Sequence, residues 1–134
     1  MTMPDVTVPI TALYAGLAAL LVLAFALAVI RLRWRTKTGI GDGGDRRLAR
    51  AIRVHGNAAE YVPLALVLLL IAELNHAGPA LLHGCGAVLI AARVAHAIGL
   101  NRSAGTSTGR MLGTVCTFGV VIVLAAVDIA VFLR

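Results

Sequence analysis

The chain has 134 residues, of which 60% are hydrophobic, and its formal net charge is +6. Soluble domains are usually about 45–50% apolar, so this composition and a mean hydropathy of +0.93 exclude an ordinary water-soluble fold. The short chain also leaves no room for a separate soluble module. We therefore expect a single integral membrane domain over residues 1–134, which functions in or beside the bilayer.

Four apolar segments are long enough to cross a hydrocarbon core of roughly 30 Å, which requires about 20 residues. They cover residues 10–30, 48–74, 79–100 and 111–133. Their periodicity is helical rather than the alternating pattern of a membrane β-barrel. The first segment is longer than the core of a signal peptide and follows no basic residue, so we expect it to be retained. The prediction is an all-α integral membrane four-helix bundle of up-down topology.

The basic residues predict the orientation of the bundle. Nine of the twelve lie in or beside the first and third connections: Arg31, Arg33, Arg35, Lys37, Arg46, Arg47, Arg50, Arg102 and Arg110. Arg53 and Arg93 lie inside predicted helices, and Arg134 lies on the other side. Because cytoplasmic loops are rich in Lys and Arg, both connections are expected to face the cytoplasm and both termini to face away from it. In a bacterium the protein would lie in the inner membrane, and the charge indicates topology rather than nucleic-acid binding.

Several features outside the polar positions have structural interpretations. Cys85 and Cys116 lie in apolar segments without metal-ligand spacing, so we expect packing residues and no metal site. The glycine-rich segment 38–45 is expected to be a flexible turn rather than a phosphate-binding loop, with Asp45 capping the second helix. Glycines spaced four apart favour close approach of helices at the start of the fourth segment. These are Gly105, Gly109 and Gly113.

Polar and charged residues interrupt the second and third predicted helices. On the second helix they are four, three, four and three residues apart, which places them within about 80° on one face. These are Arg46, Arg50, Arg53, Asn57 and Glu60. The third helix carries Arg93 and His96, which share a face because they are three residues apart. A charge in the middle of a membrane helix costs at least ~2.5–3.5 kcal/mol, so these residues must face a partner or a wet cavity.

Two interpretations of these residues stay open. In the first, Glu60 pairs with Arg93, Asn57 bridges them, and the contact holds the bundle together. In the second, the surplus positive charge binds an anion, because one carboxylate cannot neutralise both Arg53 and Arg93. A matching ligand carries several carboxylates or phosphates, which arginine binds bidentately. Glutathione fits, with two carboxylates, an ammonium and a thiol, and the positive field would favour its nucleophilic thiolate.

Two motifs resemble those of a known family. The run Arg-Val-His-Gly-Asn-Ala-Ala-Glu-Tyr-Val-Pro-Leu at 53–64 resembles the second-helix signature of the MAPEG family, the membrane-associated proteins in eicosanoid and glutathione metabolism. The run Arg-Val-Ala-His at 93–96 resembles the third-helix motif of that family, and the likeness extends over essentially the whole chain. The resemblance implies a detoxifying homotrimer with three glutathione sites at subunit interfaces, open to the cytoplasm. Its second substrates would be lipophilic electrophiles or hydroperoxides.

The resemblance also implies which residues form the site. The glutathione-binding residues would be Arg31, Arg53, Asn57, Glu60, Arg93 and His96. Arg31 would reach the site from a neighbouring subunit. Arg110, which opens the fourth helix, would be the catalytic residue that stabilises the thiolate.

The family's eicosanoid enzymes carry tyrosines where this chain has Leu100 and Thr114. This difference favours a general transferase or peroxidase over leukotriene or prostaglandin synthesis. The alternative is a non-enzymatic family-like membrane protein that binds glutathione or lipid. A third hypothesis, a small transporter, is disfavoured because the first helix lacks the essential acid of small multidrug exporters.

Overall fold

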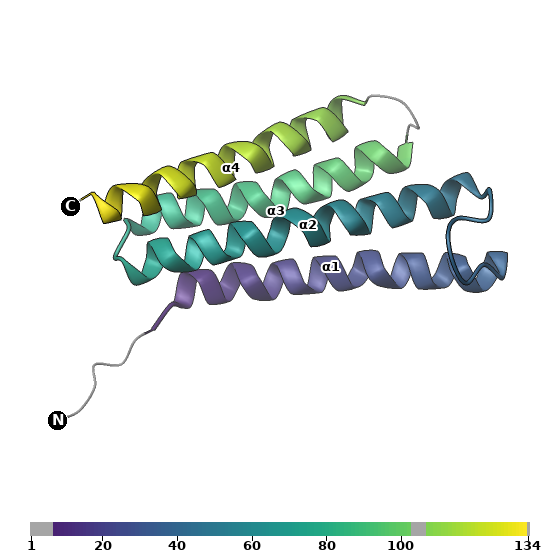
Figure 1. Cartoon of the computed structure of the whole chain (residues 1–134), viewed down its shortest axis with the longest axis horizontal. Helices are drawn as coiled ribbons and strands as arrows, with labels where there is room; N and C mark the ends of the chain where they lie inside the picture. The colour runs from purple at the N-terminus through teal and green to yellow at the C-terminus, as the bar shows by residue number, and fades with distance from the viewer. Residues whose placement is uncertain (1–6, 103–106, 134) are drawn as a thin grey trace.

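The computed structural model describes residues 7–102 and 107–133, and this part of the chain forms helices and no strands. The helices are α1 (Pro9–Thr36), α2 (Arg46–Leu74), α3 (Pro79–Arg102) and α4 (Thr108–Phe132). They lie side by side and alternate in direction (Figure 1). Each is long and apolar enough to cross a membrane. The prediction of an all-α four-helix membrane bundle is therefore confirmed.

Helix α1 continues to Thr36, six residues beyond the end of the apolar segment at residue 30. Its last turn carries Arg33 and Arg35, whose positive charges interact favourably with the C-terminal end of the helix dipole. Their long side chains can also reach the membrane surface while the backbone stays helical. Lys37 ends the helix in the left-handed conformation, and its N–H donates to the carbonyl of Arg33. Basic residues therefore extend the helix instead of ending it.

Asp45 caps the start of α2, as expected. Its carboxylate accepts hydrogen bonds from the backbone N–H groups of Arg47 and Leu48, both at 2.8 Å. These N–H groups have no partner within the helix, so the cap compensates for backbone bonds that the first turn cannot form.

The glycine-rich connection between α1 and α2 is held by a side chain of α1. One guanidinium nitrogen of Arg33, Nη1, donates to three backbone carbonyls of the connection, those of Thr38, Gly39 and Gly41, at 3.3, 3.0 and 3.0 Å. Gly41 also has a φ of 69°, which other residues rarely adopt. Arg33 therefore orders a connection that glycine allows to turn sharply.

Helices α2 and α3 are central to the bundle, since each contacts the other three helices, whereas α1 and α4 do not contact each other within the described residues. Helices α3 and α4 approach closely at two glycines of α4. A Cβ at Gly113 would lie 2.5 Å from the carbonyl oxygen of Ala92, and one at Gly109 would lie 3.1 Å from that of Ala95. The expected role of these two glycines in close packing is confirmed, while Gly105 and Arg134 lie outside the described residues.

We call the two ends of the bundle the closed end and the basic end. The closed end contains the starts of α1 and α3 and the last turns of α2 and α4. The basic end contains the last turns of α1 and α3 and the starts of α2 and α4, where the basic residues gather. Between the two ends, large apolar side chains such as Leu20 and Ile122, each 68% exposed, form an outer surface suited to lipid.

The largest apolar cluster of buried residues lies towards the closed end, where three side chains also join the helices. Its members include Tyr14, Leu69, Leu82, Leu89 and Leu124. The carboxylate of Glu73 on α2 accepts from the backbone N–H groups of Ile10, at 2.9 Å, and Thr11, at 2.7 Å. The Tyr14 hydroxyl on α1 lies 3.2 Å from Nδ1 of His83 on α3. Glu73 therefore caps α1 from the neighbouring helix, and α1 is fixed to both α2 and α3.

Candidate ligand-binding site

The basic end contains a cavity of about 380 Å³ that we call the arginine groove. It lies between the first turns of α2, the last turn of α3 and the first turn of α4. Its lining residues are Arg46, Ala49, Arg50, Arg53, Leu100 and Arg110. Among the described residues, four guanidinium groups and no acidic side chain therefore line one cavity, which gives it a strongly positive potential.

Local sequence patterns account for this convergence of arginines. Arg46, Arg50 and Arg53 are four and three residues apart, so they lie on one face of α2. On α4, the Ser107 side chain caps the first turn by accepting from the backbone N–H of Arg110, at 3.3 Å. Close packing of α4 at its glycines then brings Arg110 to the α2 arginines. The electrostatic attraction of such a groove for anions is strongest where water is partly excluded.

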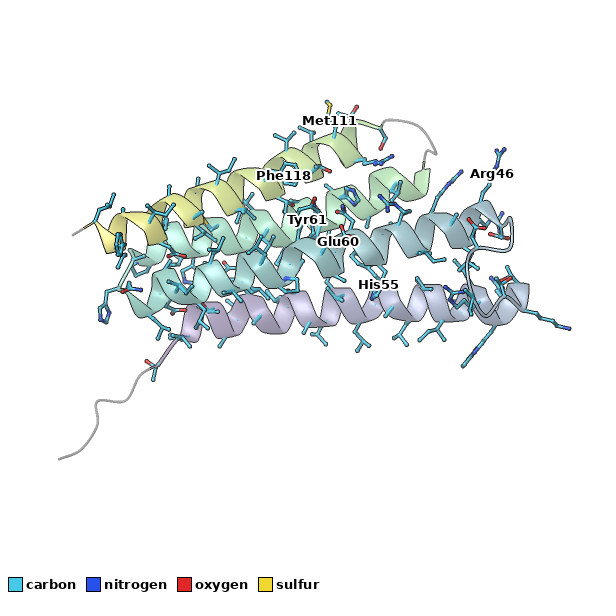
Figure 2. The ribbon with its side chains drawn as sticks, viewed as in Figure 1. Arg46, His55, Glu60, Tyr61, Met111 and Phe118 are labelled. Carbon is cyan, nitrogen blue, oxygen red and sulfur yellow. The ribbon has the colours of Figure 1, made fainter. Side chains whose placement is uncertain are left out.

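Of the residues that the sequence indicated, the structure brings Arg53 and Arg110 together in the groove. Glu60 does not line the groove. It is the middle residue of α2, and its side chain is exposed on the single chain. Figure 2 shows Glu60 and Tyr61 near the middle of α2 and Arg46 at its start. The Tyr61 ring packs against Phe118 of α4, with ring centres 5.3 Å apart.

Arg93 is 2% exposed and joins three helices. From α3 it donates one hydrogen bond to Oδ1 of Asn57 on α2 and another, at 2.8 Å, to the carbonyl of Gly113 on α4. The Thr117 hydroxyl donates to the same carbonyl at 2.8 Å. The bonds of Arg93 thus go to Asn57 and Gly113, and the Glu60–Arg93 pair of the first interpretation does not form. Arg93 is nevertheless a structural link between helices, with Asn57 as one partner.

His96 and Arg31 also lie outside the lining of the groove. His96 is 4% exposed and lies against α4, since a Cβ at Gly113 would be 2.7 Å from its Cβ. Arg31 is exposed on α1, a helix that contributes no residue to the groove of the same chain. The groove of one chain therefore contains two of the seven predicted site residues, Arg53 and Arg110.

The sequence interpretation did not assign Arg46, Arg50 and Leu100 to the site, although each carried a signal. Arg46 and Arg50 share the helical spacing of Arg53, although the sequence interpretation used them only to orient the chain. Leu100 is four residues after His96, so the two residues share a face of α3. Leu100 gives the groove an apolar wall beside its four cations.

The comparisons with known proteins agree with this architecture. The MAPEG family model matches residues 11–129. The inner membrane protein YecN of Escherichia coli, found in two strains of that species, is 48% identical over 92 residues, which cover 69% of this chain and 70% of that protein. The four spans and this relative together identify a multi-pass inner-membrane protein.

Proposed function

The chain belongs to the MAPEG family, and from that premise we propose that it is a membrane-bound, glutathione-dependent transferase or peroxidase acting on lipophilic electrophiles or hydroperoxides. The arginine groove is the observation that supports this function best. Its four guanidinium groups suit a small molecule with more than one carboxylate, because arginine binds carboxylates through two parallel hydrogen bonds.

Glutathione fits the residues of the groove in charge and in size. Its two carboxylates match the arginines of α2, and its ammonium group matches Glu60, an acidic residue of the same helix that lies outside the groove lining of the single chain. A volume of about 380 Å³ falls within the roughly 300–1,000 Å³ usual for small-molecule sites. Glutathione would supply a thiolate that attacks an electrophilic carbon and displaces its leaving group; two thiols would reduce one hydroperoxide to an alcohol and water, leaving a disulfide.

The role we propose for Arg110 is to favour the anionic form of a thiol held in the groove. Arg110 is in the first turn of α4, and its guanidinium lines the groove where the N-terminal end of the helix dipole adds positive potential. A positive environment of this kind increases the thiolate fraction, and the thiolate is the reactive form. The apolar wall formed by Leu100 would exclude water from the same space.

A homotrimer with glutathione sites at the subunit interfaces belongs to the same proposal. Glu60 is exposed at the midpoint of α2, where contact with lipid costs at least ~2.5–3.5 kcal/mol. A second copy of the chain that covers this face of α2 avoids that cost. In such an assembly, Arg31 of one subunit could reach the groove of its neighbour.

A family member that binds glutathione or lipid without catalysis is the second candidate, and two residues favour it. Leu100 contributes a hydrocarbon side chain to the groove. The Thr114 hydroxyl donates to the backbone carbonyl of Arg110, at 3.0 Å. Neither position therefore provides the aromatic hydroxyl found in the eicosanoid enzymes of the family.

Binding and turnover can be measured separately on the full chain in detergent. Glutathione affinity, thiolate absorbance, and conjugation of an aromatic halide or reduction of an organic hydroperoxide would be compared for the wild type, Arg53→Gln and Arg110→Gln. Arg35→Gln is the matched control, because Arg35 is an exposed arginine of α1 outside the groove.

We expect Arg53→Gln to weaken glutathione binding about tenfold or more, which corresponds to the loss of one charge-assisted contact. Arg110→Gln should retain binding but lose thiolate absorbance and turnover. Binding by the wild type without thiolate or turnover would favour the second candidate. Absence of binding, or an equal loss of binding in Arg35→Gln, would contradict the assignment of the groove.

A further inference from the structure

A second cavity, of about 350 Å³, lies at the basic end between α1 and α2, and we call it the α1–α2 cavity. We propose that it binds an anionic amphiphile with one acyl chain and a carboxylate or phosphate head. This site is separate from the arginine groove and does not depend on glutathione chemistry. Among the lining residues that the structure describes, the two cavities have Arg50 in common and no other.

The lining of the α1–α2 cavity changes in polarity along the helices. Phe25 of α1 and Val54 of α2 provide apolar surface away from the basic end, and Phe25 packs against the buried cluster that contains Val54. Leu32 adds apolar surface near the end of α1. Arg47 and Arg50 lie at the start of α2, closer to the end of the bundle. The cavity is therefore apolar towards the middle of the membrane and cationic towards its surface, as an amphiphile with its head at the surface requires.

The charges and the volume restrict the class of ligand further. Within the described part of the chain, two guanidinium groups and no acidic side chain line the α1–α2 cavity, so it favours an anionic head over a neutral or zwitterionic one. A volume of about 350 Å³ is at the lower end of the roughly 300–1,000 Å³ range for small-molecule sites. This volume suits a single acyl chain rather than the two chains of a phospholipid.

The ligand can be tested on the full chain in detergent without glutathione. Palmitate and a lysophosphatidylglycerol provide the carboxylate and phosphate heads, and methyl palmitate is the neutral control. Native mass spectrometry would count bound molecules. The fluorescence of Trp34, which is the single tryptophan of the chain and lies two residues after Leu32, would report affinity in the wild type and in the arginine variants. In the variants that add a tryptophan, titration by native mass spectrometry would report affinity.

Two variants with matched controls locate the binding. Arg47→Gln removes one exposed cation of the α1–α2 cavity, and Arg35→Gln removes an exposed arginine outside it. Ala28→Trp fills the cavity from an exposed position on α1, and Ala24→Trp places the same side chain one turn earlier, outside the lining. Since Arg47 is exposed, Arg47→Gln keeps the test decisive if Ala28→Trp fails to fold.

We expect at least one of the two anionic amphiphiles to bind and methyl palmitate not to bind; comparison of palmitate with the lysophospholipid identifies the preferred head. Arg47→Gln should weaken that binding at least fivefold and Ala28→Trp should abolish it, with both controls unchanged. Glutathione affinity should stay unchanged in Arg47→Gln, which separates this test from that of the proposed function. Equal binding of methyl palmitate, or full affinity in both cavity variants, would overturn the proposal.

Discussion

The closed end and the basic end of this bundle differ in how they use polar side chains. At the closed end, the polar groups of Glu73 and Tyr14 are hydrogen-bonded to other helices beside the largest apolar cluster. At the basic end, four arginines surround a cavity. Polar contacts thus join α1 to α2 and α3 at one end, whereas arginines of α2 and α4 surround a ligand-sized space at the other. This division lets a small bundle keep a ligand-sized opening without losing its fold.

The Arg93 contacts with Asn57 and Gly113 lie between these two ends, and we expect their removal to cause the largest loss of stability. Asn57→Ala leaves the buried Arg93 guanidinium without one of its partners, which should lower the free energy of unfolding by about 3 kcal/mol. Arg93→Met removes the charge together with its need for partners, so its effect should be smaller. Denaturant unfolding in detergent measures both. A larger loss in Arg93→Met would show that the charge itself stabilises the fold.

Loss of the Glu73 cap should have the next largest effect. Glu73→Ala leaves two N–H groups at the start of α1 without acceptors and removes a negative charge from the positive end of the helix dipole. We expect a loss of about 1–2 kcal/mol, discounted for partial exposure, with glutathione affinity unchanged. Glu73→Gln keeps an acceptor oxygen, so it should lose only about half as much stability as Glu73→Ala. If Glu73→Ala weakened glutathione binding without lowering stability, the separation of the two ends would be wrong.

Tyr14→Phe should produce a smaller change, because it removes only the hydrogen bond to His83 and keeps the packed ring. A loss of about 0.5–1.5 kcal/mol is expected in the same unfolding assay. Tyr61→Phe is the matched control, since the Tyr61 hydroxyl makes no hydrogen bond within the described part of the chain. Equal losses in both variants would indicate that the Tyr14 contact contributes nothing specific.

Arg46→Gln at the basic end should have the smallest effect on stability, within about 0.5 kcal/mol, because Arg46 is exposed. Its expected effect is on glutathione, whose affinity should fall a few-fold through loss of one cation of the arginine groove. Parallel measurements of unfolding and glutathione affinity would test this. A clear loss of stability would mean that the basic end also holds the helices together.

The sequence predicted the helices well because hydropathy and length determine what can cross a bilayer. It missed the extension of α1 to Thr36, since a hydropathy pattern ends at the first arginines whereas a helix does not. The cap of α2 by Asp45 could be predicted because a helix cap is local in sequence. The cap of α1 by Glu73 could not, because its donors are 62 and 63 residues away.

The candidate site was less predictable because it too depends on contacts between residues far apart in the sequence. Helical spacing put the α2 arginines on one face, and the structure places Arg46, Arg50 and Arg53 in one groove. Spacing alone could not show that Arg93 turns towards Gly113, because that contact depends on the close approach of α4 to α3. Nor could it show that Glu60 is exposed on the single chain, because that depends on which helices pack against this face of α2.

The unequal lengths of the helices have a consequence for the membrane around them. At about 1.5 Å per residue, the 28 residues of α1 and 29 of α2 span about 42 and 44 Å, whereas α3 and α4 span about 36 and 38 Å. Figure 1 shows α1 and α2 extending further at the basic end. A thicker bilayer would therefore draw Arg110 towards the hydrocarbon while Arg33 and Arg35 still reach the surface. Because mismatch costs only fractions of a kcal/mol per Å, lipid composition would set the depth at which the groove lies.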